Sequence, residues 1–142
     1  MEARPLRYRL FIDESGDHTY TNLGRASGRY LALLGVWFRT EDHAAFERGL
    51  EEFKHRVFGS RDGKPPVVLH RHEAVNHMGP FGALRDPAVE RTFNDGLLGL
   101  ISAADYRMIL VNIDKLQHHF KYAEPWNPYS YALQAMLDRY CG

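Results

Sequence analysis

Three carboxylates near the start of the chain are the first candidates for chemistry. Asp13, Glu14 and Asp17 follow an apolar-alternating run, residues 8–12, and surround a glycine of the kind that ends a strand in a turn. The pattern predicts a strand that holds Asp13 at a sheet edge. Carboxylates this close repel one another unless water, a basic side chain or a hard divalent cation screens them. The alternative is an Asp-Ser-Gly turn in which Asp13 or Ser15 only bonds the backbone.

A second acid closes another apolar run. Residues 108–113 are continuously apolar apart from one asparagine, which predicts a strand, and Asp114 ends it. If this strand lies beside the first, Asp13 and Asp114 converge at one sheet edge. A two-metal phosphoryl-transfer site needs such a pair to clamp the attacking and leaving oxygens, and Glu14 and Glu73 are candidates to complete it. The structural alternative is that strands often end in Asp because turns begin there.

Histidines cluster in residues 70–77. A zinc metalloprotease helix needs two histidines four residues apart, whereas His72 and His77 are five apart and diverge by about 140° on a helix. On a strand, His70 and His72 would share one face, which leaves a metal or phosphate contact open beside a purely structural role. The chain has neither a phosphate-binding Gly-rich loop of standard spacing nor a Gly-x-Ser-x-Gly elbow, so nucleotide-binding and serine-hydrolase chemistry have no motif support.

Apolar runs and amphipathic segments alternate along the chain. Strands are expected at residues 8–12, 30–38 and 108–113, the first two antiparallel. Helices are expected to begin at Thr40 and after the N-cap residues Asp86 and Asn127. Residues 67–69 are expected to be a further short strand, and residues 76–87 and 117–126 to be connections. This order favours an α/β layered fold.

Composition limits the classes of function. The 142 residues fit one domain, and 44% apolar with 25% charged residues is ordinary for a soluble globule. Eighteen basic and eighteen acidic residues cancel, so any polyanion site must be local. The longest apolar run is too short to span a bilayer and no apolar leader is seen, so we expect a cytoplasmic protein without a membrane partner. The single cysteine, Cys141, excludes an internal disulfide and a cysteine-based zinc site.

Taken together, five segments resemble the family catalogued as domain of unknown function 3800. They are residues 11–17, 34–36, 69–73, 111–115 and 129–133. The resemblance runs through essentially the whole chain, and it implies a ribonuclease-H-like fold, a mixed sheet with flanking helices, whose acidic residues bind Mg²⁺ or Mn²⁺. It implies Asp13 as the metal ligand of the first strand and Asp114 as that of the later strand. Glu14 and Glu73 are further candidates, and His70 would contact substrate.

Family members continue past the third helix with another acidic strand and a last helix, whereas this chain ends at Gly142. We therefore expect residues 1–142 to be a single domain that matches the N-terminal part of the family domain. The functional hypothesis is a metal-dependent, nuclease-like phosphodiester hydrolase with nucleic acid as its partner. The alternative is a non-catalytic binding or interaction module that keeps the fold.

Overall fold

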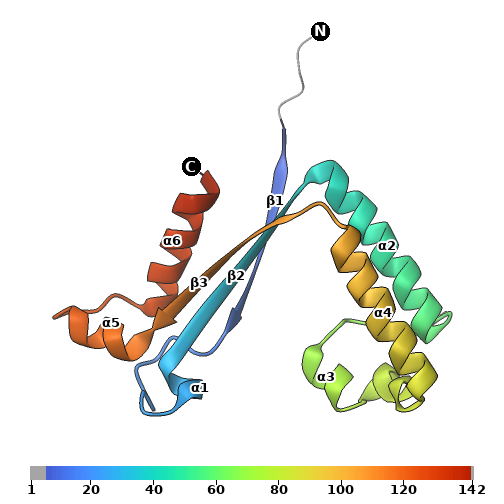
Figure 1. The fold of residues 1–142 in the computed structure, drawn as a ribbon, viewed down its shortest axis with the longest axis horizontal. Coiled ribbons are helices and arrows are strands. Elements are labelled where there is room, and N and C mark those ends of the chain that lie inside the picture. Colours follow the sequence, from blue (N-terminus) through green and yellow to red (C-terminus); the bar gives the residue numbers. More distant parts are fainter. Residues whose placement is uncertain (1–5, 142) are drawn as a thin grey trace, which may run out of the picture. The chain divides into compact units, whose positions relative to one another are not determined.

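The computed structural model describes residues 6–141 and divides the chain into two compact units (Figure 1). The sheet unit comprises Met1–Arg39 and Tyr106–Gly142, and the helical unit comprises Thr40–Asp105. Together they contain a sheet and several helices, which confirms a mixed α/β composition. The expectation of one folding domain stays a prediction.

The sheet unit is built on three antiparallel strands in the order β1-β2-β3. They are β1 (Tyr8–Ser15), β2 (Tyr30–Arg39) and β3 (Arg107–Asp114). All three expected strands and the antiparallel pairing of the first two are confirmed. The register places Asp13 opposite Leu34, and Leu34 opposite Leu110.

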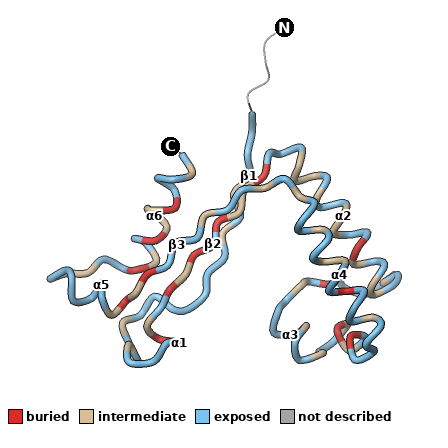
Figure 2. Tube along the Cα trace, in the orientation of Figure 1, coloured by how far each residue is buried: buried red, intermediate tan, exposed pale blue. Residues whose placement is uncertain are grey.

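One face of the sheet packs on α6 (Pro128–Cys141). Leu31 and Leu33 of β2 are almost completely buried and form a core with Ala132 and Met136 of this helix. Buried positions accordingly alternate along β2 and recur along α6 (Figure 2). Gly35 permits the close approach, because a Cβ there would lie 2.6 Å from the Met136 sulfur.

The opposite face of the sheet carries exposed apolar side chains. Strand alternation puts Phe11, Leu34, Met108 and Leu110 on this face, and all four are exposed, the last two by 63% and 66%. We call these four residues the apolar sheet face.

Two short helices complete the sheet unit. They are α1 (Ala26–Arg29), which leads into β2, and α5 (Lys115–Lys121), which follows β3 directly. The connection expected at residues 117–126 begins with a helix that the sequence did not indicate, since α5 extends to Lys121. The cause is Asp114, whose side chain caps α5 by accepting from the N–H groups of Leu116 and Gln117 at 3.1 and 3.3 Å.

The helical unit packs its elements around aromatic side chains. Its elements are α2 (Thr40–Phe58), α3 (Arg71–Val75), the 3₁₀ helix η1 (Gly79–Arg85) and α4 (Pro87–Ala103). Phe53, Phe81 and Phe93 are buried together, with ring centroids 5.5–6.1 Å apart for the pairs that include Phe93. The expected starts at Thr40 and Pro87 are confirmed, and Asp86 caps α4 by accepting from the Ala88 N–H at 2.8 Å.

Two expectations for the helical unit are wrong. Residues 67–69 form no strand: Val67 and Leu69 pack against the aromatic core, and the Val67 carbonyl oxygen accepts from Lys54 Nζ at 3.1 Å and not from a neighbouring strand. Residues 79–85, expected to lie in a loop, form η1. Its Phe81 and Leu84 are buried in the core and anchor this Gly- and Pro-containing segment.

Candidate functional site at one end of the sheet

The two predicted acidic residues lie at the same end of the sheet. Since β1 and β3 each run antiparallel to β2, they run parallel to one another, and both finish at the end where β2 begins. However, β2 lies between them, so the condition that the two strands lie side by side is not met.

The register sets the separation of Asp13 and Asp114. Asp13 pairs with Leu34 and Asp114 pairs with Tyr30, so the two acids are offset by four residues along β2. Two interstrand spacings and four residue rises place their Cα atoms about 16 Å apart. Paired catalytic ions lie only about 3.5–4 Å from one another. The register therefore does not bring these two carboxylates together as a two-ion clamp.

The same alternation collects oxygen-bearing side chains on one face near that end. Ser15 and Asn112 lie opposite Ala32 from the two sides, and Asp13 and Asp114 follow on the same face. We call Asp13, Ser15, Asn112 and Asp114 the polar corner. The polar corner and the apolar sheet face lie on the same side of the sheet. Glu14, by contrast, occupies the next position on β1 and lies on the opposite face.

Within the polar corner, Asp114 is already bound by a basic side chain. Arg29 of α1 donates from Nε to Oδ1 at 2.9 Å and from a terminal nitrogen to Oδ2, a bidentate ion pair. These bonds lower the pKa of Asp114, with the backbone N–H groups at the start of α5 adding to the effect. Asp114 therefore has a structural role, since it joins α1 to β3 and caps α5.

Asp13 differs from Asp114 in its surroundings. Its side chain is exposed on the edge strand β1, and it makes no hydrogen bond or ion pair with the described part of the chain. The backbone-bonded turn that was the alternative for the opening segment is instead made by Asp17, whose Oδ1 accepts from the N–H of Thr19 at 2.8 Å and from its hydroxyl at 2.6 Å.

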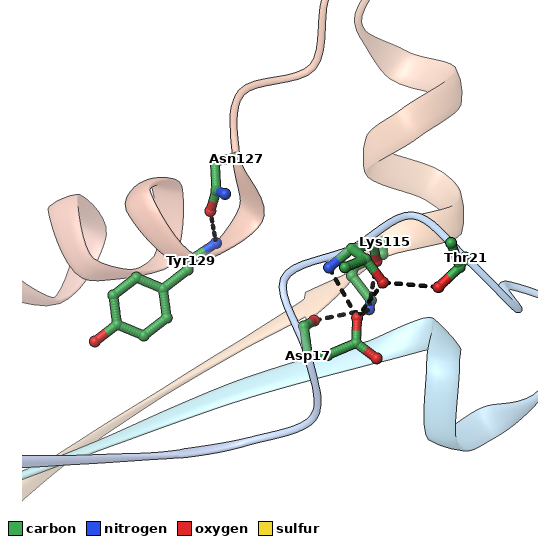
Figure 3. A network of polar contacts seen from close by, with 6 residues as sticks. Asp17, Thr21, Lys115, Asn127 and Tyr129 are labelled. Carbon is green, nitrogen blue, oxygen red and sulfur yellow. Dashed lines mark hydrogen bonds and ion pairs between the residues drawn. The ribbon is translucent and has the colours of Figure 1, made fainter.

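Lys115 fixes this turn to the end of β3. Its side chain is fully buried, and Nζ donates to the backbone oxygens of Asp17 and Thr19 at 2.8 and 2.7 Å and to the Asp17 carboxylate at 3.0 Å (Figure 3). Hydrogen bonds from Thr19 and then from Lys115 lower the pKa of Asp17 to about 2. Sequence reasoning did not single out Lys115, because its partners lie about a hundred residues away.

The other candidates belong to the helical unit. His70 immediately precedes α3 and Glu73 lies in its first turn. His72 is on the helix and His70 precedes it, so the two histidines do not lie on a strand and the shared strand face does not arise. His70 lines a cavity of about 420 Å³ with Arg71 and His77, over the buried rings of Phe81 and Phe93.

The donor set fits one kind of metal site and not another. Among residues 6–141 there is no group of three or more His, Cys, Asp or Glu side chains that could hold a metal ion. A two-ion centre that uses both Asp13 and Asp114 does not fit, given their separation and the Arg29 ion pair. A single Mg²⁺ needs only one or two carboxylates, with water and substrate oxygens as its remaining ligands. Asp13 fits that requirement.

None of the described helices is both long enough and apolar enough to cross a membrane. In comparisons with protein-family models, with curated proteins and with solved structures, nothing matches this chain.

Proposed function

We propose that this chain is a metal-dependent, nuclease-like hydrolase of phosphodiesters with a ribonuclease-H-like arrangement and nucleic acid as its partner. The observation that carries the proposal is the polar corner, where two carboxylates, an amide and a hydroxyl share one sheet face at the common end of β1 and β3. The resemblance of the opening segment, residues 11–17, supports the same assignment.

Within this proposal Asp13 holds the Mg²⁺ or Mn²⁺ ion, because its carboxylate is exposed and makes no bond to the described chain. An ion held by Asp13 would supply Lewis-acid polarisation of a water molecule or a phosphoryl oxygen. Ser15 and Asn112 offer a hydroxyl and an amide N–H₂ to substrate oxygens. The Arg29 ion pair neutralises Asp114, which reduces the repulsion that a phosphodiester would meet at the corner.

The first prediction concerns Asp13→Asn. Without metal its free energy of unfolding should stay within about 0.5 kcal/mol of wild type, because an exposed side chain without hydrogen bonds is replaced by one of the same shape. Mn²⁺ at ten times its Kd should stabilise wild type by about 1.4 kcal/mol and leave Asp13→Asn unchanged. Thermal unfolding at increasing Mn²⁺ and Mg²⁺ measures both effects, and cleavage of labelled single-stranded DNA and RNA tests activity.

Glu14→Gln is the matched control, since it removes the neighbouring charge from the other face of the sheet and should keep the response to Mn²⁺. If Asp13→Asn responds to Mn²⁺ as wild type does, Asp13 is not the ligand. Glu73→Gln and His70→Ala test, in the same assays, the roles of metal ligand and substrate contact that the resemblance implies for the helical unit.

The second candidate function is a binding or interaction module without catalysis. The bonds of Asp114 favour this candidate. Its carboxylate binds Arg29 and caps α5, so the second predicted metal ligand has a structural role here. A protein that shows neither a shift in melting temperature with Mn²⁺ or Mg²⁺ nor cleavage of either nucleic acid supports this candidate over the hydrolase.

A further inference from the structure

The sheet unit contains an aromatic cavity that shares no residue with the polar corner. It has a volume of about 370 Å³ and is formed by α5, the segment after it and α6. This volume falls within the range of small-molecule sites. The side chains that matter for its chemistry are His118, Tyr122, Glu124, Trp126, Tyr131 and Asp138.

Packing fixes the aromatic wall of this cavity. His118 is 92% buried, and its ring centroid lies 5.0 Å from those of both Tyr122 and Tyr131. The backbone of Trp126 is held from another part of the chain, because the Tyr20 hydroxyl donates to its carbonyl oxygen at 2.9 Å. The rings of His118, Tyr122 and Tyr131 therefore pack on one another before a ligand arrives, which reduces the entropic cost of binding. Trp126 itself is 69% exposed.

The start of α6 is fixed in the same way. Asn127 Oδ1 accepts from the N–H groups of Tyr129 and Ser130 at 2.9 and 3.3 Å, the first of which is drawn in Figure 3. This cap sets the first turn of the helix that carries Tyr131 and Asp138 into the cavity wall.

The carboxylates among the residues that line the cavity give it an acidic lining. Glu124 and Asp138 are carboxylates, and no Lys or Arg is among the described residues that line it. Gln134 donates to Asp138 Oδ1 at 2.7 Å and orients that carboxylate. Aromatic ring faces are electron-rich and attract cations, and the Tyr122 ring already has the Lys121 ammonium 5.6 Å from its centroid.

We propose that the aromatic cavity binds a small organic ammonium, with the charge between the carboxylates of Glu124 and Asp138 and the alkyl groups against Tyr122, Trp126 and Tyr131. A phosphate-bearing ligand would meet two like charges, and a neutral apolar ligand would leave both carboxylates unused. This ligand class goes beyond the proposed hydrolase, because the reaction at the polar corner does not need it.

The experiment compares choline with its neutral isostere, 3,3-dimethylbutan-1-ol, at constant ionic strength. The full chain carries Trp37→Phe, so that Trp126 is the only tryptophan and its emission reports on the cavity. We expect a saturable change with choline and an apparent Kd at least tenfold lower than that of the isostere. Equal affinity, or no saturable change with choline at 50 mM, would overturn the proposal. So would tighter binding of uridine monophosphate, which would indicate a nucleotide site.

Variants then test the carboxylates. Glu124→Gln combined with Asp138→Asn should weaken choline at least fivefold and leave the isostere unchanged. Asp95→Asn, an exposed carboxylate of α4 in the helical unit, is the matched control and should change neither affinity. A double variant that keeps wild-type choline affinity contradicts the proposal. If that variant does not fold, as judged by circular dichroism, the comparison of choline with its isostere in the Trp37→Phe protein decides alone.

Discussion

Lys115 is the residue on which the end of the sheet unit depends most. A fully buried ammonium is costly unless its three donors are satisfied, and here each of them reaches an oxygen. Two of the three acceptors are backbone carbonyls, so the bonds fix the course of the chain through the turn after β1.

Lys115→Met keeps the length of the side chain and removes all three donors. We expect the free energy of unfolding to fall by about 2–4 kcal/mol, because the part-buried hydrogen bonds to the carbonyls of Asp17 and Thr19 and to the Asp17 carboxylate are lost together. Urea denaturation measures the change. Lys121→Met removes an exposed ammonium from the same short helix and should stay within about 0.5 kcal/mol. A similar small effect for Lys115→Met would show that the network does not form.

The Asp17 carboxylate predicts a dependence of stability on pH. The pKa of this carboxyl is about 2 in the folded chain, against an ordinary value of 3.8. Between about pH 2 and pH 3.8 the unfolded state therefore binds more protons than the folded state. The stabilisation is complete above about pH 4 and is lost as the pH falls through about 2. The melting temperature of Asp17→Asn should therefore fall less than that of wild type between pH 4 and pH 2.

Thermal unfolding across this window measures the difference. The pKa of Asp114 is also lowered, so Asp114 adds to the pH dependence of stability. Because both proteins contain it, its effect cancels when their slopes are compared. Asp95→Asn should keep the wild-type slope. Parallel slopes for wild type and Asp17→Asn would contradict the assigned pKa.

At the scale of elements, the turn between β1 and α1 depends on one glycine. Gly16 has φ = +95°, and a Cβ built on it would lie 2.4 Å from the Tyr30 carbonyl oxygen, which is backbone and cannot move aside. Gly16→Ala should lower the free energy of unfolding by more than about 2 kcal/mol, through strain and the clash together. Gly24→Ala, in the same connection but with open space around it, should change it by less than about 0.5 kcal/mol.

Both values come from chemical denaturation of the two variants beside wild type. Equal effects of the two alanines would mean that the chain does not take the left-handed conformation at Gly16.

Element types were largely predictable where local signals were strong. The Asp-Pro and Asn-Pro pairs before α4 and α6 marked their starts, because the side chain caps the first turn and proline suits the first helical position. Asp114 caps α5 in the same way, but no proline follows it. The apolar run before Asp114 therefore indicated the end of a strand and not the start of a helix. Asp114 could have been considered as a cap from its sequence position alone.

The candidate site was predictable only in part. Periodicity places an acid near the end of a strand, and both Asp13 and Asp114 lie there. Strand order is set by pairing across the whole chain, so the position of β2 between the two strands could not be read from local pattern. The partner of Asp114 is Arg29, 85 residues away, and no spacing rule connects them.

At the scale of the whole molecule, the apolar sheet face predicts self-association. Phe11, Leu34, Met108 and Leu110 are exposed on one face of the sheet, and the outer edges of β1 and β3 pair with no further strand in the described part of the chain. Sedimentation velocity should show species larger than a monomer that grow with protein concentration.

Leu110→Lys places a charge within this surface, on strand β3, and should shift the distribution toward monomer. Leu98→Lys changes an equally exposed leucine of the helical unit, 65% exposed against 66%, and should leave the distribution as in wild type. A wild-type protein that stays monomeric at all concentrations would contradict the prediction.

The bonds from Lys115 and Trp126 to the turn after β1 also bear on how the chain acquires its structure during synthesis. β1 and β2 leave the ribosome before the helical unit, but the ammonium that holds residues 17–19 belongs to Lys115, and the acceptor for the Tyr20 hydroxyl belongs to Trp126. The helical unit must be translated in between, which takes about 4–15 s at ~5–20 residues per second. For that interval the nascent hairpin exposes the β2 edge and an open turn. During this period the exposed edge of β2 is most open to pairing with strands of other chains.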